Sequence, residues 1–163
     1  MPLPRLRTFI PWILFLALGA LVGFSPLAPA QAVRASSSKR SSPVGRWKTI
    51  DDATGKARSI VQIREDNGKL FGTIVELFDP PVPHPTCYLC GGALKNRPLV
   101  GLQVLWGFAQ VGNQWSGGEI LDPESGRIYH ASLSLEDGGK KLRLHGYFLI
   151  PWLGRTEHWL RSE

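Results

Sequence analysis

The two cysteines of the chain, Cys87 and Cys90, lie three residues apart in the segment HPTCYLCGG, with His84 just upstream. Thiols at this spacing can form a disulfide, exchange electrons as a redox pair, or provide half of a metal site. Each chemistry needs a different support: a redox pair needs a helix N-terminus, zinc needs a second pair of ligands, and a disulfide needs only a turn. The residues around the pair therefore bear on which chemistry is expected.

Four prolines precede the cysteines and two glycines follow them, which argues against the helix that would lower a thiol pKa. A zinc site would need His84 plus a further ligand, and only the single histidines His130, His145 and His158 are available. In an oxidising compartment a structural disulfide between Cys87 and Cys90 is the expected state. Metal binding and thiol exchange stay as alternatives. No other motif indicates a catalytic residue, a resident metal or a cofactor.

Aromatic side chains offer a second kind of chemistry, the binding of an apolar molecule. Arg155 would fix the orientation of such a ligand. The alternative is that the aromatic residues fill the core. The aromatic candidates for a ligand site are Trp106, Trp115, Tyr129, Phe148 and Trp159.

Residues 1–30 have the pattern of a secretory signal peptide. Two arginines precede an apolar run from Phe9 to Phe24, and Ala28 and Ala30 are small residues at the spacing that signal peptidase requires. The run is shorter than the roughly 20 residues that span a bilayer, and Pro11 interrupts it. We therefore expect cleavage, a secreted or periplasmic protein, and no membrane span in the mature chain.

The formal net charge of +6 comes from the N-terminal part of the chain. Residues 1–30 carry two arginines, and the Ser-rich segment 31–42 carries three basic residues and no acid. Residues 43–163 have 14 basic and 13 acidic residues, so this part is almost neutral and does not indicate nucleic-acid binding. We expect 31–42 to be a disordered basic linker and 43–163 to form a single domain.

Residues 43–163 alternate between short apolar-polar segments and turn residues, which predicts antiparallel strands. Asp66-Asn67-Gly68 and Gly112-Asn113 are tight-turn signals between such segments. Tight turns favour an up-and-down order, and eight strands in this order lose their edges by closing into a barrel. The expected strands are 45–50, 59–65, 70–78, 102–110, 114–121, 128–135, 141–148 and 155–161.

The hairpin around the sequence EDGG allows a test of strand faces. If Leu135 pairs with Lys140, then Leu133 pairs with Leu142, and one face of the hairpin is apolar while the other is polar. A shorter turn at Gly138-Gly139 keeps the same faces. The faces are therefore predicted more firmly than the pairing.

The first and last expected strands contain residues that suit closure of the barrel. Gly45-Arg46-Trp47 opens the first strand, and the last contains Arg161. In a closed barrel these strands are neighbours, so an arginine guanidinium can stack on the Trp47 indole, a contact worth roughly 0.5–2 kcal/mol.

A GxW motif that enters the first strand of a secreted eight-stranded barrel resembles the lipocalin and calycin superfamily. The chain more closely resembles a secreted bacterial family known as domain of unknown function 2147, over nearly all of residues 43–163. The resemblance implies a closed or nearly closed, calycin-like barrel and no established activity. The motifs that carry it are GRW at 45–47, FGTIVEL at 71–77, KNRPLVGLQVL at 95–105, GGEILDPESGRIY at 117–129, LRLHGY at 142–147 and GRTEHWLR at 154–161.

We therefore expect a small exported barrel, monomeric, that binds an apolar small molecule or an envelope protein partner. The sequence favours a binding protein over an enzyme, although an enzyme that uses the cysteine pair stays as a rival. The alternatives are a structural envelope protein with a filled core, and a thiol-redox or metal protein that uses Cys87 and Cys90.

Overall fold

The computed structural model describes residues 41–51 and 53–162. The predicted signal peptide 1–30 and most of the predicted linker 31–42 lie outside the described residues. Each of the eight predicted strands is present, with ends that differ from the prediction by at most two residues. The elements are β1 (Gly45–Ile50), β2 (Ala57–Asp66), β3 (Lys69–Leu77), η1 (Gly92–Leu94), β4 (Gln103–Val111), β5 (Gln114–Asp122), β6 (Arg127–Glu136), η2 (Asp137–Gly139), β7 (Lys141–Tyr147) and β8 (Gly154–Ser162).

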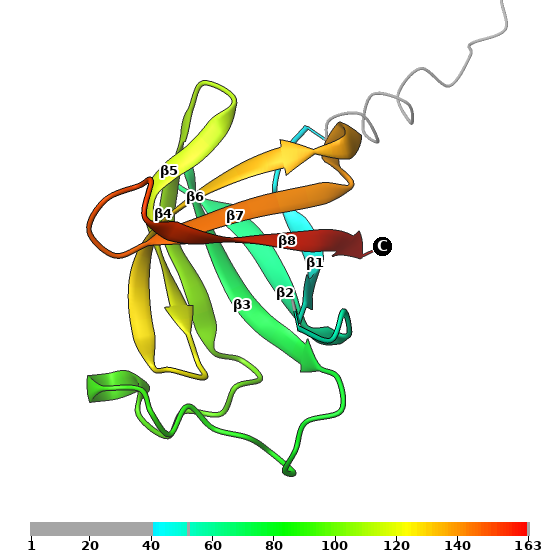
Figure 1. Ribbon diagram of the computed structural model, residues 1–163, viewed down its shortest axis with the longest axis vertical. Helices are drawn as coiled ribbons and strands as arrows, with labels where there is room; N and C mark the ends of the chain where they lie inside the picture. The colour runs from blue at the N-terminus through cyan, green and yellow to red at the C-terminus, as the bar shows by residue number, and fades with distance from the viewer. Residues whose placement is uncertain (1–40, 52, 163) are drawn as a thin grey trace, which may run out of the picture.

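The strands form a closed antiparallel barrel in the order β1 to β8, which confirms the predicted up-and-down topology (Figure 1). Each strand pairs with its neighbour in sequence, and β1 pairs with β8 through Arg46–Ser162, Trp47–Arg161 and Lys48–Leu160. No helix in the described part of the chain is long and apolar enough to cross a membrane.

The β6–β7 hairpin has the predicted faces but not the first pairing we considered. Leu133 pairs with Leu144 and Leu135 with Leu142, a slide of two residues that matches the shorter turn at Gly138-Gly139. Ala131, Leu133, Leu142 and Leu144 are buried. A slide of two residues leaves every side chain on its face, because the side-chain period of a strand is two.

The two ends of the barrel differ in their connections. The β2–β3, β4–β5 and β6–β7 turns are short and lie at one end, which we call the closed end. The β1–β2, β3–β4, β5–β6 and β7–β8 connections lie at the other, the open end. Large buried side chains such as Ile63, Leu70, Phe108 and Leu142 lie within a few residues of the short turns. The packed core therefore fills the closed end.

Trp47 and Arg161 occupy the closed end together. The guanidinium carbon of Arg161 lies 4.2 Å from the centre of the Trp47 ring. Arg161 donates from Nε to the Gly139 carbonyl (2.6 Å) and from its two terminal nitrogens to the carbonyls of Val44 (3.1 Å) and Ser42 (2.8 Å). One side chain thus joins the N-terminal approach to β1, the β6–β7 turn and β8.

Trp47 is fully buried, and its Nε1 donates to the Pro43 carbonyl at 2.6 Å. A Cβ atom on Gly45 would lie 2.9 Å from an Arg161 nitrogen, at a φ of +138°. Glycine at the first position of GxW therefore leaves the space that the guanidinium needs. Burial lowers the pKa of Arg161.

The long β3–β4 connection is folded against the open end. Within it, Cys87 N–H donates to the Arg97 carbonyl (2.9 Å) and Leu99 N–H to the Pro85 carbonyl (2.9 Å). The loop also packs on the β5–β6 turn: a Cβ on Gly126 would lie 2.2 Å from the Leu89 carbonyl oxygen. The absence of a side chain at Gly126 thus allows the backbones of the two connections to contact each other.

We predict that Arg161→Lys lowers the free energy of unfolding by about 2–4 kcal/mol. Lysine keeps the charge, but its single ammonium cannot reach the Gly139 carbonyl and the Ser42 and Val44 carbonyls together. Lysine also lacks the planar group that stacks on Trp47. The matched control is Arg46→Lys, because Arg46 makes an exposed ion pair with Glu76 (3.0 Å). This control should cost less than about 1 kcal/mol.

Urea unfolding of the two variants, followed by tryptophan fluorescence, measures both effects. Equal losses in Arg161→Lys and Arg46→Lys would contradict a special role for the contact at the closed end.

Candidate ligand-binding site

A cavity of about 820 Å³ lies at the open end of the barrel. Its lining comes from the ends of the strands and from the β1–β2, β3–β4 and β5–β6 connections. The closed end is filled by the large side chains next to the short turns, whereas the connections at the open end, the 25-residue β3–β4 connection above all, leave space between them.

The floor of the cavity is apolar. It consists of inward-facing residues of five strands, all of them buried. Because the strands alternate inward and outward side chains, each inward position near the open end adds an apolar surface to the cavity. The floor residues are Val61, Ile74, Val104, Leu121 and Trp159.

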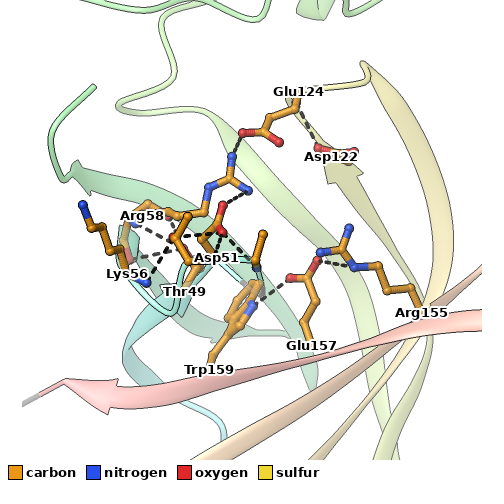
Figure 2. A network of polar contacts seen from close by, with 12 residues as sticks. Thr49, Asp51, Lys56, Arg58, Asp122, Glu124, Arg155, Glu157 and Trp159 are labelled. Carbon is orange, nitrogen blue, oxygen red and sulfur yellow. Dashed lines mark hydrogen bonds and ion pairs between the residues drawn. The ribbon is translucent and has the colours of Figure 1, made fainter. Parts of the chain in front are cut away.

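Polar groups lie directly next to this floor. The hydroxyls of Thr49 and Ser59 are hydrogen bonded at 2.8 Å, and Ser59 N–H donates to Thr49 Oγ1 at 3.1 Å. Trp159 donates from Nε1 to Glu157 Oε2 (3.2 Å), as Figure 2 shows. Arg155 Nε lies 3.8 Å from the other Glu157 oxygen. The buried indole of Trp159, the carboxylate of Glu157 and the guanidinium of Arg155 thus form a chain of polar contacts along β8.

A second set of charged groups lies at the mouth, on β2 and beside the ends of the neighbouring strands (Figure 2). Arg58 lies 3.6 Å from Asp51 Oδ2 and is ion paired with Glu124 of the β5–β6 turn. Asp51 Oδ1 accepts hydrogen bonds from Thr54 N–H (2.8 Å) and the Thr54 hydroxyl (3.0 Å). These bonds hold the pKa of Asp51 below its usual range, and the charge of Arg58 acts in the same direction.

The cavity lining has more acidic than basic groups. Five carboxylates stand against three cations, so with neutral histidine the formal charge is −2. A cavity with an excess of one sign raises the local concentration of molecules with the opposite sign. The acidic residues are Asp51, Asp79, Asp122, Glu124 and Glu157, and the basic residues are Lys56, Arg58 and Arg155.

Of the six residues that the sequence analysis proposes for ligand binding, Arg155 and Trp159 line the cavity. The other four are not among the lining residues. Trp115 is buried in the core, one residue beyond the β4–β5 turn, and Trp106 is half-buried and packs against the core. Tyr129 and Phe148 contact each other edge to face, with ring centres 6.0 Å apart, and Phe148 is exposed just after β7. Aromatic composition alone does not distinguish these environments.

Cys87 and Cys90 form a disulfide, with their Cα atoms 5.3 Å apart. Both residues are buried in the β3–β4 connection, and the cavity is lined by Tyr88, which lies between them, and by His84 upstream. Among the described residues, no three His, Cys, Asp or Glu side chains lie close enough to hold a metal ion. The disulfide fixes the shape of a loop at the mouth.

The sequence analysis does not single out Glu157. Glu157 lies two residues from both Arg155 and Trp159, and side chains at this spacing share one face of a strand. It also missed the Thr49–Ser59 pair and the rim formed by Arg58, because residues of β1, β2 and the β5–β6 turn meet only in the folded barrel.

The fold is similar to that of a solved protein. The structure of protein HP1028 from the human pathogen Helicobacter pylori, described as belonging to the lipocalin family, matches with a TM-score of 0.65 and 23% sequence identity. The match covers 75% of this chain and 84% of that chain. No curated protein matches the sequence.

The family is shown by the sequence itself. Residues 45–161, nearly the whole barrel, match the family described as uncharacterized protein conserved in bacteria (DUF2147). The expected resemblance is therefore confirmed, and the lipocalin-like fold agrees with it. The chain belongs to this bacterial family.

Proposed function

We propose that this protein is an exported binding protein that holds a small amphipathic molecule in the open end of its barrel. The observation that carries the proposal is the cavity of about 820 Å³ with an apolar floor and a charged rim. Its volume lies within the range of about 300–1,000 Å³ that is usual for ligand pockets. A structural envelope protein with a filled core would not need this space.

The lining favours a ligand with an apolar body and a cationic or hydrogen-bond-donating head. The body would lie on the floor against Val104 and Trp159, because contact there removes apolar surface from water. The head would reach Glu157, the carboxylate that accepts a hydrogen bond from Trp159 of the floor. A ligand with a carboxylate head would meet the net charge of −2 on the lining.

Export is part of the proposal. The N-terminal pattern of residues 1–30 and a disulfide between Cys87 and Cys90 both suit an oxidising compartment outside the cytoplasm. The disulfide lies in a loop with extensive backbone hydrogen bonds, which supports a structural role over thiol exchange. An envelope protein partner would bind outside the cavity, on the loops that surround the mouth.

Titration with the neutral fluorescent amine N-phenyl-1-naphthylamine tests whether the cavity binds. We expect saturable binding with one site per barrel. Val104→Phe should weaken it about tenfold or more, since the larger ring occupies the floor. Val111→Phe, an exposed position at the closed end, is the matched control and should bind as the wild type does. No saturable response, or equal weakening by both variants, would contradict the proposal.

Competition with decylamine, decanol and decanoic acid at neutral pH tests the head group. We expect the amine to bind most tightly and the acid about tenfold or more weakly, because a hydrogen bond to an ionised group is strong and like charges repel. Glu157→Gln should reduce the difference in affinity between the amine and the acid, whereas Glu76→Gln on the outer surface should leave it unchanged. An acid that competes as well as the amine would overturn the assignment of the head group.

A further inference from the structure

The β7–β8 connection, residues 148–153, has the sequence FLIPWL and contains no polar side chain. We call it the apolar tip. Phe148 is 60% exposed, Leu149 84%, Trp152 82% and Leu153 74%. Exposed large apolar residues that occur singly need no explanation, but a contiguous group of this kind marks an interaction site. The binding cavity does not account for the tip, because none of these four residues is among its lining.

The tip is held in a defined shape by polar contacts at its base. The His145 ring bonds to the Thr156 hydroxyl through Nδ1 (2.9 Å) and to the Pro151 carbonyl through Nε2 (2.5 Å). The carbonyl can only accept, so Nε2 carries the proton and Nδ1 accepts from Thr156. At the base of the tip the backbones of Gly154 and Gly146 lie close together, and a Cβ atom on Gly154 would clash with the Gly146 carbonyl oxygen. The apolar side chains therefore project from a supported loop.

Some backbone N–H and C=O groups of the tip have hydrogen-bond partners within the protein. Leu153 N–H donates to the Ile150 carbonyl at 3.1 Å, the Pro151 carbonyl accepts from His145, and Pro151 has no N–H. Backbone groups that enter an apolar phase need internal partners, because lipid chains offer none. The Ile150 and Pro151 carbonyls, which lie between the two most exposed side chains Leu149 and Trp152, meet this requirement.

The shape and chemistry of the tip fit a lipid surface. The connection projects as a narrow loop beyond the strands that it joins (Figure 1). A fluid bilayer can surround such a projection, whereas a protein partner would need a matching hole. Tryptophan prefers the boundary between lipid and water. The chain has no acidic residue between Asp137 and Glu157, and Arg155 lies at the base of the tip with a side chain 68% exposed.

We infer that the apolar tip inserts into the surface of a lipid bilayer and places the open end of the barrel against it. Arg155 stands at the base of the tip and also lines the cavity, so a ligand could pass between bilayer and barrel over a short path. The inference rests on the exposed side chains of the tip and their support. The inference therefore does not depend on what the cavity binds.

Co-sedimentation with vesicles of phosphatidylethanolamine and phosphatidylglycerol tests the inference. The full-length chain is expressed in a bacterium and purified in the form that the cell retains, and its N-terminus is determined by mass spectrometry. The test variant is Leu149→Ser/Leu153→Ser, which keeps Trp152 as a fluorescent reporter. Its control is Val111→Ser, 64% exposed in the β4–β5 hairpin at the closed end. All three proteins share the same N-terminus, so a difference between them comes from the substituted residues.

We expect the wild type and Val111→Ser to sediment with vesicles, with a shift of tryptophan emission to shorter wavelength. Leu149→Ser/Leu153→Ser should partition about tenfold or more weakly, because two large apolar side chains no longer leave water. Urea unfolding should be unchanged in this variant, since both side chains are exposed.

Three results would overturn the inference. The first is a wild type that stays in solution with vesicles present. The second is a double variant that binds vesicles as tightly as the wild type. The third is a concentration-dependent dimer of the wild type, seen by sedimentation velocity and lost in the double variant, because the tip would then be a contact between copies of this chain.

Discussion

The pairing of β1 with β8 closes a row of eight strands into a barrel. It is the only pairing that joins the two ends of the barrel sequence, and three residue pairs make it. Arg161 strengthens it from one end by stacking on Trp47 and by donating to three carbonyls in two segments, the approach to β1 and the β6–β7 turn. Without this closure β1 and β8 would be edge strands with unpaired backbone groups.

Closure also divides the barrel into two ends with different roles. At the closed end, short turns bring large side chains together and Trp47 covers them, so the interior is packed. At the open end, the interior widens into the cavity. An eight-stranded barrel is just wide enough for its side chains to fill it or for one small ligand to enter. In this protein side chains fill the closed end, and the cavity lies at the open end.

The fold could be predicted from the sequence because its main signals are local. Alternation defined the strands, turn residues such as Asn67-Gly68 separated them, and the GxW motif indicated which strand begins the barrel. The β6–β7 pairing was less certain for a physical reason: turns that differ by two residues bury the same leucines. Strand alternation therefore predicts faces better than partners.

The site was predicted less well, because its residues come from distant parts of the chain. Trp159 and Arg155 were identified, but Glu157 between them was missed although the same alternation places it on their face. The aromatic character of Trp115 and Phe148 suggested a ligand site, yet one packs in the core and the other is exposed beside the apolar tip. Ion pairs across the mouth, such as Arg58 with Glu124, depend on the barrel closing.

Amide hydrogen exchange measured by NMR tests closure most directly. If β1 and β8 pair in solution, backbone N–H groups of residues 46–48 and 160–162 that are hydrogen bonded between the two strands should exchange slowly with solvent. Their protection should be similar to that of the β6–β7 hairpin. Exchange at these amides as fast as in an unpaired chain, with the other strands protected, would show an open sheet and contradict the account.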